Sequence, residues 1–277
     1  MSFTRAAEDL GITQSGVSRQ IKTLEDYLGV TLFKRSGSRL VLTDSGRVYA
    51  AEVSGALDKL EQASIDVVRG EKAHSDLLIG SLPTLASRWL SPRLDGFTAA
   101  NRECRIEITP ISNNIDFAST PIDVAILRGA GSWTAAVSYE LFPEEIVVVA
   151  APSLIPPDAS LDPMSFASFP LLQNAARPSL WLQWIRASRL DYRGTIQGVR
   201  FAHTAMLINA AVSGLGLAVA PTVLVARDLK SGALHAPLGP PVRTGDSYYV
   251  VFPERKAHFP AVKAFRDWLM RETRSQR

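Results

Sequence analysis

Polar and cationic side chains share one face of a short helical pattern near the amino terminus. Ser15, Ser18, Arg19 and Lys22 lie opposite the apolar positions of the segment 14–28. Hydroxyl groups and cations in the first half of a helix suit the major groove of DNA, where base edges offer acceptors and phosphates flank them. The alternative interpretation is an ordinary amphipathic helix with a solvated polar face.

Two short helices joined by a glycine turn must hold this face in place. The first helix is predicted to end at Gly11, and its small alanines allow a second helix to approach closely. Thr13 has the hydroxyl group that caps the start of the second helix. The predicted apolar faces are Phe3, Ala6, Ala7 and Leu10 in the first helix and Val17, Ile21, Leu24 and Leu28 in the second.

A basic hairpin is predicted directly after these helices. The segment 32–43 reads as two short strands around Ser36-Gly37-Ser38, with Lys34, Arg35 and Arg39 beside the turn. From Arg19 to Arg47 there are six Lys or Arg residues against three Asp or Glu residues, and this surplus favours phosphate contacts. Ordinary surface charge is the alternative explanation.

The motifs SFTRAA, TQSGVSRQI, LEDYLG, LFKR and LTDSG follow one another in this order, and the run resembles the LysR-type bacterial transcriptional regulators. The resemblance implies a winged helix-turn-helix head that reads double-stranded DNA. It assigns base contacts to Gln14, Ser15, Ser18 and Arg19, and phosphate contacts to Lys22, Lys34, Arg35 and Arg39.

Members of that family carry a further helix before the SFTRAA segment, whereas this sequence begins at Met1. Without that helix, Phe3, Ala6, Val17 and Leu24 are expected to lose part of their cover. We therefore expect weak DNA binding if the chain truly starts there. The alternative is a truncated regulator that dimerises and binds its effector but not DNA.

Composition sets the wider frame. A chain of 277 residues with 46% hydrophobic and 21% charged residues is typical of a soluble protein of two or three domains. The single Cys104 excludes a disulfide framework and a cysteine-based zinc site, and it indicates a reducing compartment. There is no apolar run of membrane length and no signal-peptide core, so we expect a cytoplasmic protein.

A long helix is predicted from a Thr43 cap to about Arg69, with Gly70 ending it. Its apolar positions alternate at spacings of four and three, which is typical of a coiled-coil seam between two chains. A helix that faces its own core is the alternative. In the resembled family this helix pairs two subunits, so a homodimer or homotetramer is expected. The predicted seam is Tyr49, Val53, Ala56, Leu60, Ala63 and Val67.

Strands and helices alternate from residue 73 onward, which predicts parallel sheets with helices on their faces. The predicted domains are 1–43 for the head, 44–72 for the linker helix and 73–277 for a two-lobed α/β domain. Lobe I covers about 73–150 and 251–277, and lobe II about 151–250. Predicted strands are 77–80, 106–108, 122–127, 146–150, 199–201, 217–220 and 248–252, and predicted helices start at Pro83, Trp181, Ala205 and Pro260.

The second half extends the resemblance through SLPTLASRWLSPRL, PIDVAILRGAGSW, LLQNAARPSLWLQW, AAVSGLGLAVAP and AFRDWL. These look like the effector domain of the branch that includes glycine-cleavage and β-lactamase regulators, which implies a periplasmic-binding-protein-like fold and a small-molecule effector.

Four of the expected effector-binding residues lie where a predicted strand is followed directly by a predicted helix. Ser81 and Thr84 in one lobe, and His203 and Thr204 in the other, stand near helix starts whose free N–H groups favour a carboxylate. Simple helix capping by Thr84 and Thr204, and a surface or capping role for His203, are the alternatives.

Arg128 is the fifth expected effector-binding residue, and it marks a departure from the resembled branch, which carries its arginine one position earlier, where Leu127 stands here. Side chains alternate across a strand, so this shift turns the guanidinium to the other face. Ala130 and Ala202 also replace acidic residues usual in that branch. The effector is therefore expected to differ from those of its relatives.

Enzymes and exported binding proteins are the rival classes. The sequence has no G-x-S-x-G elbow, no H-E-x-x-H motif and no glycine-rich phosphate loop, so neither catalysis nor a metal or other cofactor is expected. A solute-binding protein without a DNA role is opposed by the winged head and the lack of an export signal. The sequence predicts an effector-responsive, DNA-binding regulator.

Overall fold

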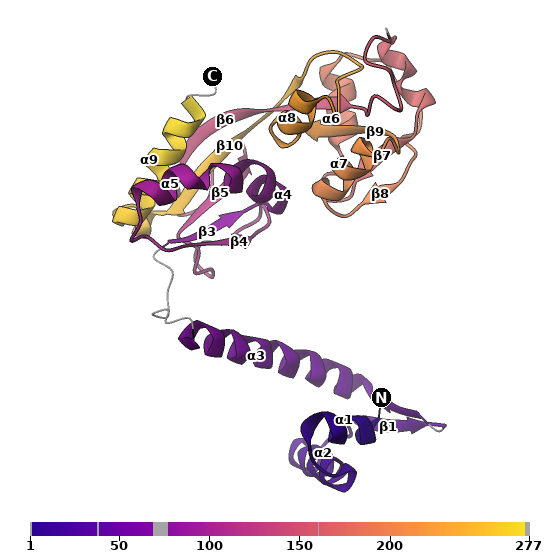
Figure 1. Ribbon diagram of the computed structural model, residues 1–277, viewed down its shortest axis with the longest axis vertical. Helices are drawn as coiled ribbons and strands as arrows, with labels where there is room; N and C mark the ends of the chain where they lie inside the picture. The colour runs from indigo at the N-terminus through magenta and orange to yellow at the C-terminus, as the bar shows by residue number, and fades with distance from the viewer. Residues whose placement is uncertain (1, 38, 69–76, 160, 275–277) are drawn as a thin grey trace. The chain divides into compact units, whose positions relative to one another are not determined.

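The computed structural model describes residues 2–37, 39–68, 77–159 and 161–274 (Figure 1). The chain divides into two compact units, an amino-terminal unit, Met1–His74, and a carboxy-terminal unit, Ser75–Arg277. Each unit is described by itself below.

Local capping explains both helices of the head. Helix α1 (Phe3–Leu10) ends at Gly11, whose φ of 66° is a left-handed conformation that glycine adopts without strain. Helix α2 (Gln14–Leu28) begins after Thr13, whose Oγ1 accepts a hydrogen bond from the Gly16 N–H at 3.1 Å. The predicted glycine turn and threonine cap are confirmed.

Small residues form the contact between the two helices. Ala7 of α1 and Val17 of α2 are buried, and Phe3 packs edge-to-face on Phe33 with ring centroids 5.3 Å apart. The prediction that Leu10 lies on the buried face is wrong, because its side chain is 68% exposed. Leu10 is the last residue of α1, and the helix contact is centred one turn earlier at Ala7.

The hairpin and the linker helix follow. Strands β1 (Phe33–Ser36) and β2 (Arg39–Leu42) pair antiparallel, which confirms the predicted wing. Glu25 joins the wing to α2, because its Oε1 accepts from the N–H groups of Leu32 at 2.6 Å and Phe33 at 3.0 Å. Thr43 caps helix α3 (Asp44–Val68) by accepting from the Gly46 N–H at 2.9 Å.

Helix α3 presents uncovered apolar side chains. Val48, Leu57 and Leu60 are 67%, 58% and 64% exposed, and several exposed apolar side chains on one helix are typical of an interaction surface. The predicted helix end at Arg69 and Gly70, and the side chain of Val67, lie outside the described residues.

Within the described part of the carboxy-terminal unit, eight strands form a sheet in the order β4-β3-β5-β10-β6-β9-β7-β8. Strands β3, β4 and β5 are parallel and carry lobe I, and β7, β8 and β9 are parallel and carry lobe II. The strands are β3 (Leu77–Ser81), β4 (Ile106–Pro110), β5 (Val124–Gly129), β6 (Ala136–Val149), β7 (Leu171–Asn174), β8 (Arg200–Phe201), β9 (Leu217–Pro221) and β10 (Val242–Pro253).

Two long strands join the lobes and run antiparallel to their neighbours, whereas the alternation of strands and helices predicts parallel pairing. Strand β10 runs antiparallel to both β5 and β6, and β6 runs antiparallel to β9. The predicted strand 146–150 is the second half of β6, which begins at Ala136. Its first half pairs only with β10, and its last four residues pair with β9, so β6 passes from lobe I into lobe II.

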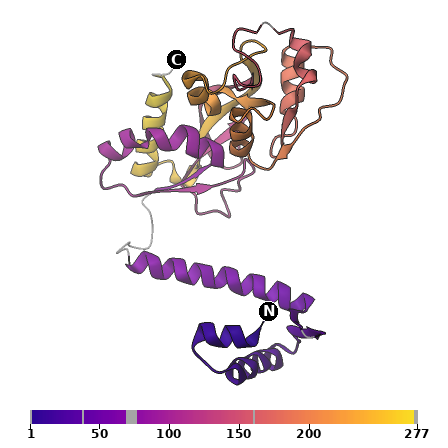
Figure 2. The same cartoon turned by 45° about the vertical axis from the view of Figure 1, so that its right-hand side comes forward.

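Helices cover both lobes. Helices α5 and α9, far apart in the sequence, lie side by side in both views, with the Phe97 and Phe265 rings 5.2 Å apart (Figures 1 and 2). The helices are α4 (Pro83–Leu85), a π-helical turn (Ala86–Leu90), a 3₁₀ turn (Ser91–Arg93), α5 (Leu94–Ala100), α6 (Leu180–Ala187), α7 (Thr204–Val212), α8 (Thr222–Ser231) and α9 (Pro260–Arg274), with 3₁₀ turns at Pro163–Ser168 and Glu254–Lys256. Helix α8 and strand β7 are not among the elements predicted from the sequence.

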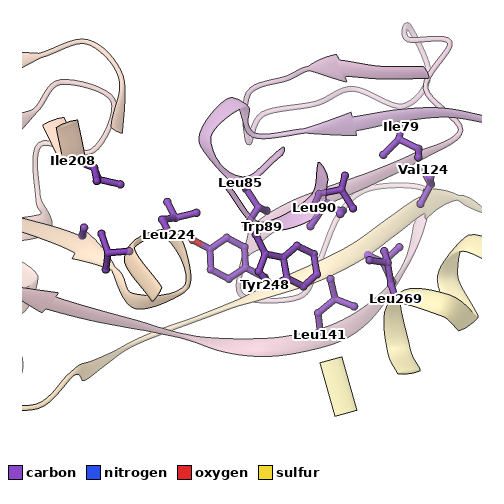
Figure 3. Close-up of a cluster of buried hydrophobic side chains, with 14 of the residues drawn as sticks. Ile79, Leu85, Trp89, Leu90, Val124, Leu141, Ile208, Leu224, Tyr248 and Leu269 are labelled. Atoms are coloured by element: carbon purple, nitrogen blue, oxygen red, sulfur yellow. The ribbon is translucent and has the colours of Figure 1, made fainter. Parts of the chain in front are cut away.

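One apolar core continues through both lobes. Leu85 and Trp89 from lobe I and Ile208 and Leu224 from lobe II belong to the same buried cluster, as Figure 3 shows. A second cluster combines lobe II residues with the last part of β6, and in it Trp184 packs edge-to-face on Phe166. The lobes are therefore joined by packing as well as by strands.

Candidate nucleic-acid interface and ligand cavity

The predicted base-reading side chains all face solvent. Gln14, Ser15, Ser18 and Arg19 are exposed on α2. Val17 is buried behind them, and Ile21 and Leu24 are half-buried. The apolar stripe of α2 therefore anchors the helix and leaves the polar face free.

A groove brings α2 and the wing together. Five of the predicted residues line this groove of about 1050 Å³, and Glu25 and Asp26 lie on the same wall. Ser15 and Arg19 are exposed beside it rather than in it. The Arg39 side chain lies outside the described residues. The five are Gln14, Ser18, Lys22, Lys34 and Arg35.

A second hollow lies between the lobes of the carboxy-terminal unit, with a volume of about 300 Å³. Its walls come from the segments that follow β3, β4, β7, β8 and β9 and from the end of β5, so the carboxyl ends of parallel strands in both lobes meet there. We call it the interlobe cavity. It is lined by Leu82, Pro83, Thr84, Leu85, Ile111, Ser112, Asn113, Arg128, Ala176, Arg177, His203, Thr204, Pro221, Leu224 and Tyr248.

Four of the five residues predicted to bind an effector line this cavity, namely Thr84, Arg128, His203 and Thr204. Ser81 does not. It is the last residue of β3, its side chain is fully buried, and its Oγ lies 3.5 Å from the Leu82 carbonyl oxygen. The strand end encloses this hydroxyl, so Ser81 does not line the interlobe cavity.

Neither threonine caps a helix. The N-cap positions of α4 and α7 are Leu82 and His203, and neither side chain makes a capping hydrogen bond. Thr204 Oγ1 instead accepts from Asn174 Nδ2 at 2.9 Å. The first N–H groups of α7 thus lie at the cavity wall without a side-chain cap, an arrangement that favours a negative group.

The side chains of Leu127 and Arg128, near the end of β5, have different surroundings. Leu127 packs into a small apolar cluster with Phe117 and Val251, whereas Arg128 lines the interlobe cavity. The two residues therefore lie on opposite faces, as the alternation predicts. Arg128 forms an ion pair with Asp246, and its Nη1 lies 3.7 Å from Glu144 Oε2.

Glu144 is a fully buried carboxylate behind the cavity. Arg177 donates to it twice, from Nη1 to Oε1 at 2.7 Å and from Nη2 to Oε2 at 2.8 Å. The hydroxyls of Tyr248 and Thr244 donate to it at 3.0 Å each. These partners come from both lobes and from β10. The buried Glu144 carboxylate therefore holds the cavity-lining side chains of Arg128, Arg177 and Tyr248 in place, and we call this group the cavity floor.

Tyr248 keeps its proton in this setting. Burial of the phenol, together with the negative charge of Glu144, raises the pKa of Tyr248 far above its usual range. Its hydroxyl therefore remains a hydrogen-bond donor at the cavity wall.

Family models match both units. Residues 1–47 match the bacterial regulatory helix-turn-helix protein of the lysR family, and residues 70–274 match the LysR substrate binding domain. The chain belongs to the LysR family of transcriptional regulators. As a LysR-type regulator it binds DNA through its helix-turn-helix unit and responds to a small-molecule effector.

Curated relatives extend along nearly the whole regulator. The glycine cleavage system transcriptional activator of Escherichia coli (strain K12) is 33% identical over 271 residues, covering 98% of this chain and 88% of that protein. The transcriptional activator AmpR of Pseudomonas aeruginosa is 31% identical, covering 98% of this chain and 90% of that protein. These relatives are transcriptional regulators rather than enzymes.

Solved structures share the fold of the regulator. The effector domain of AmpR of Pseudomonas aeruginosa covers 72% of this chain and 95% of its own, with a TM-score of 0.62 and 28% identity. CrgA, a LysR-type regulator of Neisseria meningitidis, covers 98% of this chain and 94% of its own, with a TM-score of 0.56 and 23% identity. Among the described residues, no helix combines the length and apolar character needed to cross a membrane.

Sequence reasoning missed several residues that line the cavity of the regulator or lie behind it. Arg177 follows β7, a strand that was not predicted, so its place at a strand end was hidden. The apolar run 146–149 indicates a buried segment, but Glu144 and Glu145 both precede it, and the sequence does not show which of the two is buried. Asn113 closes the end of β5 by accepting from the Arg128 N–H and donating to the Arg128 carbonyl oxygen.

Proposed function

We propose that α2 reads base edges in the major groove, with Gln14, Ser15, Ser18 and Arg19 as the reading residues. Lys22 and the wing residues Lys34, Arg35 and Arg39 hold the phosphates. The observation that carries this proposal is the exposure of the whole polar face of α2 above a buried Val17. Because DNA is the target, the protein works in the cytoplasm.

Replacement of Arg19 with alanine tests this assignment. Binding sites are first selected by the unaltered full-length chain from a pool of random duplexes. Affinity for a selected duplex and for random DNA is then compared by fluorescence anisotropy at one salt concentration. A lost guanidinium–base contact lowers affinity for the selected site by about 1–3 kcal/mol, whereas random DNA is affected much less.

Lys59→Ala is the matched control, because it removes one positive charge from the exposed surface of α3. It should leave the ratio of selected to random affinity unchanged. Equal ratios for the Arg19 and Lys59 variants would refute the reading role. A chain that selects no sequence at all would favour the alternative regulator that binds an effector without gripping DNA.

We also propose that α3 pairs two chains, so that residues 1–43 form the head, 44–72 the pairing helix and 73–277 the effector domain. Support comes from the seam positions on α3, where Val53 and Leu60 are exposed. A homodimer, or a homotetramer built from it, places two heads on a two-fold related DNA site.

The effector is proposed to occupy the interlobe cavity, whose volume of about 300 Å³ suits a small organic molecule. A carboxylate on the effector is proposed to lie at the start of α7, beside His203 and Thr204, with the Thr84 hydroxyl and the Arg128 guanidinium on the facing wall. The support is the uncapped helix start together with an otherwise largely apolar lining.

Pairs of compounds test the carboxylate separately from the cavity. Thermal shifts of the full-length chain are measured with small monocarboxylic acids and with the primary amide of each acid. We expect acids to stabilise the protein and their amides to do so less, and Leu224→Trp to abolish both effects by filling the cavity. Equal stabilisation by the acid and the amide of every pair would refute the preference for a carboxylate, but it would not contradict binding in the interlobe cavity.

A further inference from the structure

Arg88 joins the two lobes beside the interlobe cavity. Its Nη1 donates to the carboxylate of Asp228 at 2.5 Å and to the carbonyl oxygen of Leu224 at 3.0 Å. Its Nη2 lies 3.4 Å from Asn209 Oδ1. Arg88 belongs to lobe I, and the three acceptors belong to helices of lobe II. One guanidinium therefore spans the boundary between the lobes.

The elements that Arg88 connects also build the cavity. It follows Pro83–Leu85, which lines one wall, by a single helical turn. Asn209 lies on α7, which begins at the wall residue Thr204. Asp228 lies on α8, which begins after the wall residue Pro221. Each of the three helices thus has its first turn at the cavity and its middle at Arg88.

The surroundings strengthen this connection. The side chains of Arg88 and Asp228 are only 22% and 18% exposed, so water screens their attraction less than at an open surface. Leu224 contributes twice, because its carbonyl oxygen accepts from Arg88 and its side chain enters the core shared by both lobes (Figure 3). The hydrogen bonds of the Arg88 guanidinium and the apolar packing of Leu224 therefore join the lobes at the same place.

The helix that presents Arg88 departs from regular α geometry. Residues Ala86–Leu90 form a π-helical turn, and the Ser91 N–H bonds to the Ala86 carbonyl oxygen five residues earlier. Such a widened turn changes the direction of the side chains on it and occurs often at functional sites. Here it is the turn that carries the interlobe guanidinium.

We propose that Arg88 is a positioning residue of the interlobe cavity: through Asp228, Leu224 and Asn209 it sets the separation of the cavity walls before any ligand arrives. This inference rests on the proposed function only for the identity of the ligand. The separation of the lobes is measurable in the ligand-free protein, so the two proposals fail independently.

The experiment measures one intrachain distance across the lobes. Spin labels are attached to Thr98→Cys on α5 and Ala187→Cys on α6, both exposed positions, in a full-length chain with Cys104→Ser. Labelled chains are mixed with an excess of unlabelled chains, so that pulsed electron spin resonance reports distances within one chain. Arg88→Ala and Asp228→Asn are then compared with the unaltered pair.

We expect both variants to add longer distances to the distribution, with the population of separated lobes rising about tenfold, which corresponds to about 1.4 kcal/mol. The exchanged pair Arg88→Asp with Asp228→Arg should recover much of the narrow distribution. A role in folding alone would lower the melting temperature without moving the distances.

Lys256→Ala is the matched control. Lys256 pairs with Asp123 at the same 2.5 Å, with side chains 17% and 16% exposed, but both residues belong to lobe I. It should lower stability and leave the interlobe distance unchanged. The proposal is overturned if Arg88→Ala and Asp228→Asn give the unaltered distribution, or if Lys256→Ala widens it to the same extent.

Discussion

Replacing Glu144 with glutamine removes the buried charge that ties the cavity floor together. The carboxylate is fully enclosed and accepts two hydrogen bonds from Arg177 and one each from Thr244 and Tyr248. Glutamine keeps the size of the side chain but turns one acceptor oxygen into a donor amide. At least one of the four donors then faces another donor, and Arg177 loses its opposite charge.

The expected cost follows from burial. Breaking a buried ion pair by removing one partner typically costs about 3–5 kcal/mol, because the remaining charge is left uncompensated. The neighbouring Glu145→Gln is a matched control, since that carboxylate is 41% exposed and lies 3.6 Å from an Arg243 side chain that is 75% exposed. Exposed pairs contribute about 0–1 kcal/mol. The two variants should therefore differ by at least ~2 kcal/mol.

Tryptophan fluorescence during urea unfolding provides a selective assay. All five tryptophans of the chain lie between residues 75 and 277, so their signal follows the carboxy-terminal unit alone. The free energy of unfolding is taken from the linear dependence on urea concentration. Equal losses for Glu144→Gln and Glu145→Gln would refute the view that Glu144 neutralises buried guanidinium groups.

Three further predictions concern pH, packing and assembly. Tyr248 has a raised pKa in the folded chain, whereas the unfolded residue ionises near pH 10. The stability that its protonated form contributes is therefore complete below about pH 10 and falls above it by up to ~1.4 kcal/mol per pH unit. Tyr248→Phe should flatten this slope in urea titrations between pH 9 and 11, and an unchanged slope would contradict the raised pKa. Gly46→Ala should destabilise the amino-terminal unit by about 1–3 kcal/mol, because a Cβ atom there would meet the Leu32 carbonyl oxygen at 2.1 Å. Gly55→Ala on the same helix meets nothing within 4 Å and should stabilise the unit by about 0.5–1 kcal/mol. Hydrogen exchange of the α1 and α2 amides measures both effects, and unchanged exchange in Gly46→Ala would show that the backbone at Leu32 can move to accept a methyl group. Leu60→Glu places a charge in the proposed α3 seam and should shift sedimentation to smaller species. Ala51→Glu, on the opposite side of α3, should leave sedimentation unchanged. Equal shifts for the two variants would rule out the seam.

Local hydrogen bonds explain why the head was predictable. The Gly11 turn and the Thr13 and Thr43 caps are each satisfied within a few residues, so the sequence contains all the groups involved. The one failure in the head, Leu10, depends on where α1 ends relative to the contact with α2. Positions at the last turn of a short helix depend on tertiary packing that periodicity does not record.

Long-range pairing explains the failures in the carboxy-terminal unit. Most strands fell where apolar runs predicted them, but the antiparallel direction of β10 follows from its pairing with β5 and β6, about 120 and 100 residues earlier in the chain. Helix α8 was missed because Thr222 and Val223 open it with β-branched side chains that favour strands. Alternation within one strand was more informative, since it placed Leu127 and Arg128 on opposite faces.

Those opposite faces bear on how the cavity distinguishes ligands. The Arg128 and Arg177 guanidinium groups line the cavity, and the carboxylates of Asp246 and Glu144 balance their charges. A guanidinium has five N–H groups, and Glu144 takes one from each of two nitrogens of Arg177, which leaves others for a ligand. The floor therefore offers directed donors with little net charge. In such a cavity, the fit of a ligand to fixed N–H groups and to the uncapped start of α7 contributes more to selectivity than its total charge, and the separation of the lobes held by Arg88 decides whether one ligand can reach both walls.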